Sequence, residues 1–161
     1  MGLRSAIDTE DVQIRRATSS DLLAIYRLEK QVFDDPWSYS VFEGFLGESA
    51  FLIAELHDEL LGYIVADWIP NFGKNLGHIK DLAVHPDARQ NGVGRLLLRH
   101  AISKLVVQGV TWIKLEVRAG NTAAQQLYSE ESFETLLQIP RYYSDGEDAL
   151  VMVYDSVDGS N

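Results

Sequence analysis

Cysteine is absent from the 161 residues of this chain. This absence excludes disulfides, cysteine-ligated zinc, iron–sulfur clusters and a cysteine nucleophile, and it fits a reducing compartment. Long apolar runs are also lacking. None approaches the roughly 18 residues that a membrane span requires, and the polar stretch Met1–Asp11 has no signal-peptide core. The expectation is a soluble, cytoplasmic protein that has no membrane partner.

Positive charge is scarce, because 14 Lys and Arg stand against 24 Asp and Glu, for a formal net charge of −10. A phosphate backbone would be repelled by this charge, so nucleic acid is not expected as a partner. Hydrophobic residues make up 46% of the chain and charged residues 24%, the balance of a globular domain. A chain of this size can bury roughly two thirds of its unfolded surface, so no structural metal is required.

The spacing of apolar residues predicts a mixed α/β (α+β) domain. Alternating or continuous apolar runs predict strands at 12–15, 50–56, 60–69, 79–84, 112–117, 133–139 and 149–154. Helical spacing predicts helices at 22–33, 37–47, 92–107 and 121–131, with a loop at 70–77. Consecutive strands without an intervening helix indicate a mixed sheet covered by helices. A flexible arm (1–11) and a disordered tail (156–161) are expected to flank one domain (12–155).

The most informative motif lies between the strand at 79–84 and the helix that follows it. Gly92 and Gly94 let the backbone come close to a ligand, and the first amides of a helix form an anion site. No acidic residue occurs between Arg89 and Leu115, although five cations do: Arg89, Arg95, Arg99, Lys104 and Lys114. A polyphosphate ligand explains this local reversal of charge; an ordinary turn with a solvated basic face is the alternative. Rossmann and P-loop glycine patterns are both absent from the sequence.

The segment Arg89–Gly94 resembles the R-x-x-G-x-G signature of the GNAT acyltransferases. His78–Pro86 is similar to that family's central strand, and Leu115–Tyr128 to its next strand and helix. Pro36-Trp37-Ser38 and Arg141–Met152 resemble one branch, the ribosomal-protein-alanine N-acetyltransferases (RimI-type) and archaeal protein N-terminal acetyltransferases. The resemblance spans about residues 12–154. It implies a GNAT fold, with a mostly antiparallel seven-stranded sheet, helices on both faces and splayed central strands.

One departure from the family pattern is Ser132, which stands where the family usually has glycine. A glycine there would suit a left-handed helix end, so Ser132 predicts a slightly different end for the last helix.

The resemblance also implies that acetyl-CoA is the cosubstrate. Backbone groups at the strand end would hold its pantetheine arm, the glycine-rich turn would hold its diphosphate, and Asn121 would hydrogen-bond to it. A plain helix cap is the other interpretation of Asn121, and the two are compatible. The implied binding residues are Leu82, Ala83, Val84, Gln90, Asn91, Gly92, Val93, Gly94, Arg95 and Asn121.

Two residues are candidates for proton transfer. Glu116 matches the family's proton acceptor, and partial burial is expected to raise its pKa toward the useful range. Tyr128 matches the acid that protonates the leaving thiolate. The alternatives are a solvated strand glutamate and a packed helix tyrosine.

Four further residues are candidates for contact with the substrate: Trp37, His78, Tyr142 and Tyr143. The aromatic side chains would line a peptide groove, and His78 would lie near Glu116; a structural aromatic cluster and a surface histidine are the alternatives. The expected reaction is acetylation of the α-amine of a protein N-terminus, such as that of a ribosomal protein, by direct attack in a ternary complex. A small-molecule amine as substrate and a non-catalytic CoA-binding module are the competing hypotheses.

Overall fold

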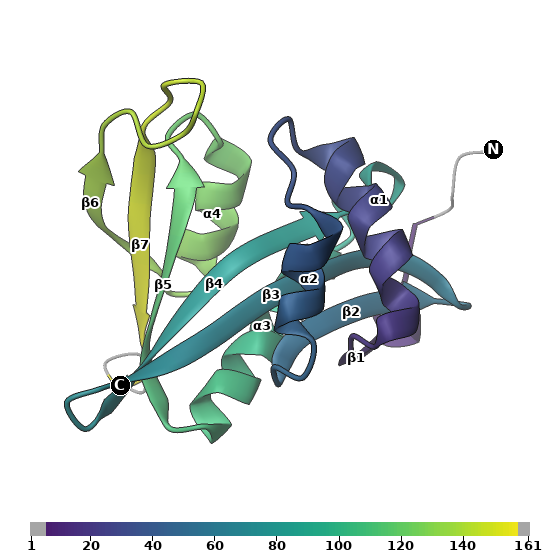
Figure 1. Ribbon diagram of the computed structural model, residues 1–161, viewed down its shortest axis with the longest axis horizontal. Helices are drawn as coiled ribbons and strands as arrows, with labels where there is room; N and C mark the ends of the chain where they lie inside the picture. Colours follow the sequence, from purple (N-terminus) through teal and green to yellow (C-terminus); the bar gives the residue numbers. More distant parts are fainter. Residues whose placement is uncertain (1–5, 158–161) are drawn as a thin grey trace. The chain divides into compact units, whose positions relative to one another are not determined.

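The computed structural model describes residues 6–157, whose strands form one seven-stranded sheet in the order β1-β2-β3-β4-β5-β7-β6 (Figure 1). Pairing is parallel between β4 and β5 and antiparallel for β1–β2, β2–β3, β5–β7 and β6–β7. The strands are β1 (Gln13–Arg16), β2 (Ala50–Leu56), β3 (Glu59–Asn71), β4 (Lys74–Val84), β5 (Val110–Arg118), β6 (Glu134–Ile139) and β7 (Ala149–Asp155). The helices are α1 (Leu22–Val32), α2 (Tyr39–Phe45), α3 (Val93–Val107) and α4 (Thr122–Glu130), with 3-10 turns at Thr9–Asp11, Ser19–Asp21 and Pro86–Ala88. The mixed sheet and four helices confirm the expected fold class. None of the helices in the described part of the chain is both long enough and apolar enough to cross a membrane.

Two expectations drawn from the sequence need revision. The loop expected at 70–77 is a tight hairpin instead, because β3 continues to Asn71 and β4 begins at Lys74. Phe72 and Gly73 make the turn, both with positive φ. The segment expected as a flexible arm contains a 3-10 turn at Thr9–Asp11, and the Ile7 N–H donates to Asn91 Oδ1 at 3.0 Å. Residues 1–5 and 158–161 of the expected arm and tail lie outside the described residues.

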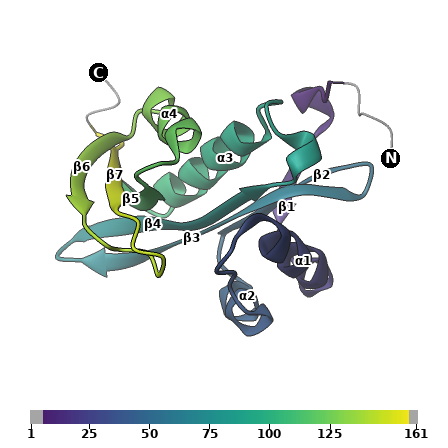
Figure 2. The same cartoon turned by 90° about the horizontal axis from the view of Figure 1, so that it is seen from above.

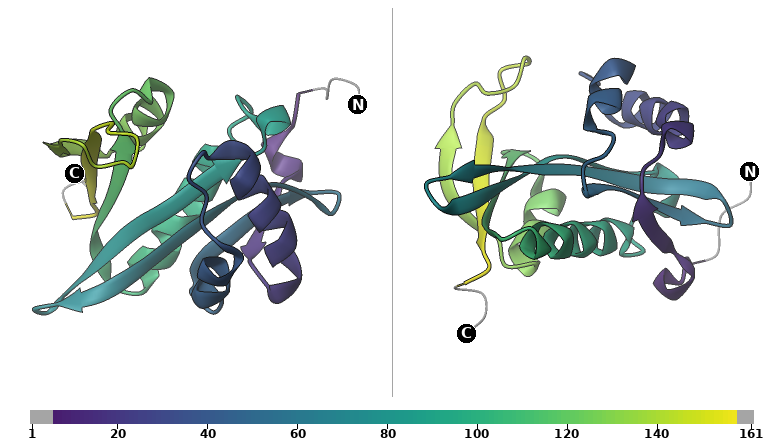
Figure 3. Two further views of the ribbon diagram at one scale, coloured as in Figure 1. Left: turned by 45° about the horizontal axis from the view of Figure 1, so that its top comes forward. Right: turned by 60° about the horizontal axis from the view of Figure 1, so that its bottom comes forward.

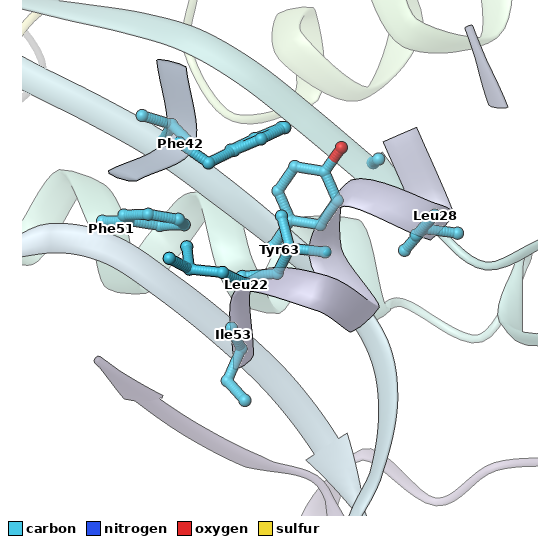
Figure 4. Packing of buried hydrophobic residues seen from close by; sticks show 9 residues of the cluster. Leu22, Leu28, Phe42, Phe51, Ile53 and Tyr63 are labelled. Atoms are coloured by element: carbon cyan, nitrogen blue, oxygen red, sulfur yellow. The ribbon is translucent and has the colours of Figure 1, made fainter. Parts of the chain in front are cut away.

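The described residues form two compact units. The first contains the chain up to Ala66 together with Asp81–Lys104. Its core lies between α1, α2 and the strands β2 and β3, where the largest buried side chains include Phe42, Phe51 and Tyr63 (Figures 2 and 4). Helix α3 packs on the other face, and a Cβ on Gly62 would lie 3.3 Å from Leu97 and only 2.5 Å from the Ala83 carbonyl oxygen. Glycine at this position therefore lets β3 and β4 approach closely.

The second unit contains Asp67–Lys80 and the chain from Leu105 onward. Here β5, β7 and β6 run side by side, and the loop between β6 and β7 extends beyond their ends (Figure 3). Registered pairs between β4 and β5 begin at Asn75 and Val110 and end at His78 and Lys114. Strand β5 continues to Arg118 beyond this last registered pair. The edge of β5 that faces β4 is therefore unpaired over the segment that carries Glu116 and Arg118. This is the expected splay.

Helix α4 ends with the conformation that a glycine would adopt, although the residue is a serine. Ser132 has φ 75°, and the Phe133 N–H donates to the Tyr128 carbonyl at 2.9 Å. The expectation of a different helix end was wrong, because the closing hydrogen bonds of this terminus impose the left-handed residue. Serine adopts that conformation at a steric cost of roughly 1 kcal/mol.

A buried polar cluster interrupts the core of the first unit. Glu29 on α1 is 2% exposed, and its Oε1 accepts a hydrogen bond of 2.5 Å from the Tyr63 hydroxyl. Asp81 lies beside this pair. Burial, and next the neighbouring Glu29, raise the pKa of Asp81 well above its ordinary value. Asp81 Oδ2 is buried with no hydrogen-bond partner among the described residues. Folding therefore favours the protonated form of Asp81.

Replacing Asp81 by Asn is expected to stabilise the protein at neutral pH. In the unfolded chain Asp81 is ionised above about pH 4, whereas the folded state raises its pKa. The wild type therefore loses stability from this group as pH rises above about 4, at about 1.4 kcal/mol for each pKa unit of difference. Thermal unfolding at pH 3.5 and pH 7.5 measures the effect. A gain in stability at pH 7.5 that disappears at pH 3.5 is expected, and an equal change at both values would contradict it.

Candidate active site

The turn that enters α3 is the predicted diphosphate site, and it lies in the first unit. Gln90 and Gly92 both have left-handed backbones, with φ 64° and 83°. Gly92 caps the helix, since its carbonyl accepts the Leu96 N–H at 3.0 Å. A helix leaves the N–H groups of its first turn without intrahelical partners, and these groups together with the helix dipole attract an anion. The turn therefore has the backbone features that the predicted diphosphate site requires, and the contact itself stays a prediction.

Side chains fix the shape of this turn from within. Asn91 Nδ2 donates to the carbonyls of Ala88 and Arg89, at 3.2 and 2.9 Å, while its Oδ1 accepts from Ile7. The Asn91 side chain therefore braces the turn. Arg89 Nε donates to the Val84 carbonyl at 3.2 Å, which ties the turn to the end of β4. Of the predicted pantetheine contacts on β4, Ala83 is buried and Leu82 and Val84 are half-buried.

A second group of candidate residues lies in the second unit, where β4 and β5 carry His78 and Glu116. His78 Nε2 and Glu116 Oε1 are 2.8 Å apart, and Lys114 Nζ lies 3.7 Å from Glu116 Oε2. The side chain of Glu116 is 13% exposed and that of His78 is 27% exposed. The structure thus brings together these two predicted residues. A histidine that hydrogen-bonds to a carboxylate can accept a proton while the carboxylate stabilises the resulting charge.

The expected rise in the pKa of Glu116 was wrong in direction. Burial does push this pKa upward, but the hydrogen bond and charge of His78, followed by those of Lys114, outweigh it and lower the pKa below its ordinary value. Glu116 is consequently a carboxylate at neutral pH. Its Oε2 is buried, and the cation beside it is Lys114 Nζ, at 3.7 Å.

Tyr142 and Tyr143 lie on the loop between β6 and β7. Their rings meet edge to face, with centroids 5.0 Å apart. Burial, and then the charge of Glu116, raise the pKa of Tyr142, so the phenol stays protonated beside the carboxylate. Tyr142 remains 46% exposed. The second unit therefore carries an exposed aromatic ring next to the His78–Glu116 pair.

The sequence reasoning did not assign Arg118, which holds this loop in place. Its guanidinium lies 4.1 Å from the centroid of the Tyr143 ring and 2.9 Å from both Asp145 and Glu147. Glu147 also accepts the Gly120 N–H at 2.8 Å. The sequence does show a cation, Arg118, at the end of β5, and two carboxylates, Asp145 and Glu147, that follow it by 27 and 29 residues. Spacing of that kind indicates a contact only once β5 and β7 are known to be neighbours.

Tyr128 and Asn121 lie on α4. Tyr128 is buried at 8% exposure and its ring packs against Phe133 at 5.8 Å. Asn121 is the N-cap of α4, and its Oδ1 accepts the Ala124 N–H at 3.2 Å. The capping role of Asn121 is therefore present. The acid role of Tyr128 and the cofactor contact of Asn121 stay predictions.

Trp37 belongs to the first unit, in the connection between α1 and α2. Its ring stacks on Phe45 with centroids 5.5 Å apart and an interplanar angle of 16°, and meets Phe42 at 5.3 Å. The proposed alternative of a structural aromatic cluster is therefore partly realised, although Trp37 itself is only half-buried. Its role in binding a peptide stays a prediction.

Comparison with known proteins shows which protein family this chain resembles. Residues 19–133 match the model of the Acetyltransferase (GNAT) family. The chain is 34% identical over 152 residues to an N-alpha-acetyltransferase of Sulfolobus acidocaldarius, covering 87% of this chain and 90% of the relative. It is 36% identical over 137 residues to the [ribosomal protein bS18]-alanine N-acetyltransferase of Escherichia coli, covering 83% and 90%.

The fold agrees with this relationship. The crystal structure of the ribosomal-protein-S18-alanine N-acetyltransferase from Escherichia coli superposes with a TM-score of 0.79 at 30% identity, covering 89% of this chain and 93% of that one. The R-x-x-G-x-G segment lies inside the matched region, at the turn described above. The chain therefore belongs to the GNAT acetyltransferase family.

Proposed function

We propose that this acetyltransferase moves the acetyl group of acetyl-CoA onto the α-amine of a protein N-terminus. The observation that carries the proposal is the hydrogen-bonded pair of His78 and Glu116, with the exposed ring of Tyr142 beside it. Of the two relatives named above, one is named an N-alpha-acetyltransferase and the other an alanine N-acetyltransferase of a ribosomal protein, and each shares about a third of its residues with this chain. Acetyl-CoA, when bound, supplies the activated acetyl thioester.

The turn at α3 fits the diphosphate of that cosubstrate. Gly92 has the left-handed backbone that favours glycine, and a Cβ there would make only an ordinary contact with Thr9 Cγ2, at 3.6 Å. The N–H groups of Val93, Gly94 and Arg95 stand in the first turn of α3, where the positive end of the helix dipole favours a negative group. Asn91 braces the turn from its N-terminal side, where Gln90 has a left-handed backbone.

The residues of β4 and β5 would remove the proton. A peptide α-amine has a pKa of about 7.7–8.0, so a sizeable fraction is already neutral at pH 7.5 and only modest assistance is needed. The amine nitrogen attacks the thioester carbon, the carbon–sulfur bond breaks, and the amine proton passes to the His78–Glu116 pair, directly or through water. Tyr128 would give its phenolic proton to the departing sulfur. Positioning of the amine by Tyr142 and Tyr143 supplies much of the remaining rate.

The proposed substrate is a protein chain rather than a small amine. The exposed ring of Tyr142 lies on a loop built from Tyr142 to Glu147, a surface suited to an extended backbone. An N-terminal alanine is the first candidate, because the E. coli relative is named for that residue on a ribosomal protein. A broader range of first residues is the second candidate, because the Sulfolobus relative is named without one.

The experiment measures release of free CoA with a thiol reagent, which meets no thiol of the protein because the chain contains no cysteine. We expect turnover with peptides that begin with alanine or serine, and none with the same peptide whose α-amine is blocked while an internal lysine stays free. Spermidine is the small-amine arm. Turnover on spermidine that exceeds turnover on every free peptide would replace the proposal with the small-molecule hypothesis, and turnover on nothing would favour a CoA-binding module.

A further inference from the structure

The connection between α1 and α2 is tied to a buried carboxylate that the chemistry above does not use. Glu29 lies in the last turn of α1, and its Oε2 accepts the Trp37 N–H at 2.8 Å across eight residues of chain. The Glu29 carbonyl also accepts the Phe33 N–H at 2.9 Å. One residue thus anchors both ends of the segment 33–37.

The second oxygen of Glu29 is fixed from the sheet side. Its partner is the hydroxyl of Tyr63 on β3, at 2.5 Å, and burial raises the pKa of Tyr63, so this hydroxyl stays protonated and donates. Tyr63 is itself fully buried, and in Figure 4 its hydroxyl points away from Phe51, Leu22 and Ile53. The carboxylate of Glu29 is therefore oriented by a rigid residue of the core before it meets Trp37.

Burial of the Glu29 carboxylate is expected to lower the free energy of unfolding rather than raise it. A buried carboxylate loses its hydration, and neutral donors such as the Trp37 N–H and the Tyr63 hydroxyl replace water incompletely. An apolar side chain of the same length would fill the site without that loss. Asp81, whose pKa is raised, brings a second carboxyl group to the same buried place. Glu29 instead fixes the orientation of the Trp37 backbone, because its carboxylate accepts the Trp37 N–H.

We propose that Glu29 is a positioning residue for peptide binding, which holds the segment 33–38 so that the Trp37 indole meets the substrate backbone. The inference rests on the proposed function and on the expectation from the sequence that Trp37 lines the peptide groove. The indole is restrained from two sides, by the tie from Glu29 to its backbone and by the stack on Phe45. When the tie is lost, the stack alone remains and the segment explores other conformations.

The test compares two variants of Glu29 with one control variant on α2. Glu29→Met keeps the length of the side chain but removes both acceptors. Glu29→Gln keeps one carbonyl oxygen that can accept the Trp37 N–H, with an amide group that can turn toward the Tyr63 hydroxyl. Glu43→Gln, at an exposed glutamate of α2, is the matched control. Thermal unfolding verifies that each variant is folded, and Glu29→Leu replaces Glu29→Met if the latter is not.

We expect Glu29→Met to raise the KM for the peptide by about tenfold, the loss of one hydrogen bond to a charged group, with kcat and the KM for acetyl-CoA close to wild type. Glu29→Gln should restore most of the peptide KM. Hydrogen exchange followed by mass spectrometry should show faster exchange in the segment 33–38 of Glu29→Met only. A purely packing role would leave the peptide KM unchanged.

Two results would overturn the inference. One is an unchanged exchange rate at 33–38 in Glu29→Met, because the tie would then not restrain the segment. The other is faster exchange with an unchanged peptide KM, because the restrained segment would then not serve the substrate. Failure of the proposed function is visible separately, as a wild type that acetylates no peptide before any variant is compared.

Discussion

Glu116→Gln is expected to lower kcat for peptide acetylation by about 100-fold or more, the range for removal of a positioned general base. Gln fills the same volume and can still hydrogen-bond to His78, so the pair keeps its geometry while its negative charge is lost. The Glu116 carboxylate lies 2.8 Å from His78 and is 13% exposed, which places the charge where it acts on that ring. The KM for acetyl-CoA should stay within about twofold, because the diphosphate turn is untouched.

The matched control is Glu134→Gln, an exposed glutamate at the start of β6 in the same unit. It should leave kcat and both KM values at the wild-type level. Combination of Glu116→Gln with Tyr128→Phe removes both proposed proton-transfer groups. A double variant that transfers acetyl groups as fast as the wild type would show that neither residue has the role assigned to it.

The pH dependence of kcat/KM distinguishes ionisation of Glu116 from ionisation of the peptide α-amine. Because His78 and Lys114 lower the pKa of Glu116, this carboxylate is ionised throughout the neutral range. A rise of kcat/KM between pH 6.5 and 8.5 therefore does not report Glu116. A peptide α-amine, which titrates at about 7.7–8.0, accounts for such a rise. The midpoint of that rise should stay where it is in Glu116→Gln, even though the plateau falls.

Gly92→Val is expected to raise the KM for acetyl-CoA by about tenfold or more. Gly92 has φ 83°, and a residue with a Cβ in this region costs roughly 1–2 kcal/mol, more when it is β-branched. The turn is expected to relax by moving Gly92 out of the left-handed region, and the amides of Val93 and Gly94 would then leave the diphosphate. The effect should appear in the KM for acetyl-CoA and in direct CoA binding measured by calorimetry, with kcat at saturating cosubstrate close to wild type.

Gly73→Val is the control for strain alone. Gly73 has nearly the same backbone, φ 82°, in the exposed β3–β4 turn, and a Cβ there meets nothing within 4 Å. Both variants should lose a similar amount of stability in thermal unfolding, but only Gly92→Val should weaken CoA binding. Equal weakening in the two variants would show that general destabilisation, rather than the diphosphate turn, explains the result.

Local patterns predicted much of this protein. Apolar spacing located the helices and strands to within a few residues, since burial of one face imposes the period. It failed at 70–77, where Lys74 and Asn75 form a strand in a polar stretch, because pairing across a hairpin needs backbone groups and not apolar side chains. Ser132 shows the same limit: its φ of 75° follows from the hydrogen bonds that close α4, which outweigh the preference of serine.

The sequence by itself determined the glycine-rich turn and the reversal of charge around it, and its resemblance to the GNAT family singled out His78 and Glu116. The turn depends on residue type and short spacing, and a motif of six residues preserves both. Tertiary structure decided the sign of the pKa shift of Glu116, since the opposing effects of burial and His78 depend on a distance across 38 residues of chain. It also decided the link from Glu29 to Trp37 and the support of Tyr143 by Arg118. Such contacts join elements that only the folded sheet brings together, so no local pattern in the chain encodes them.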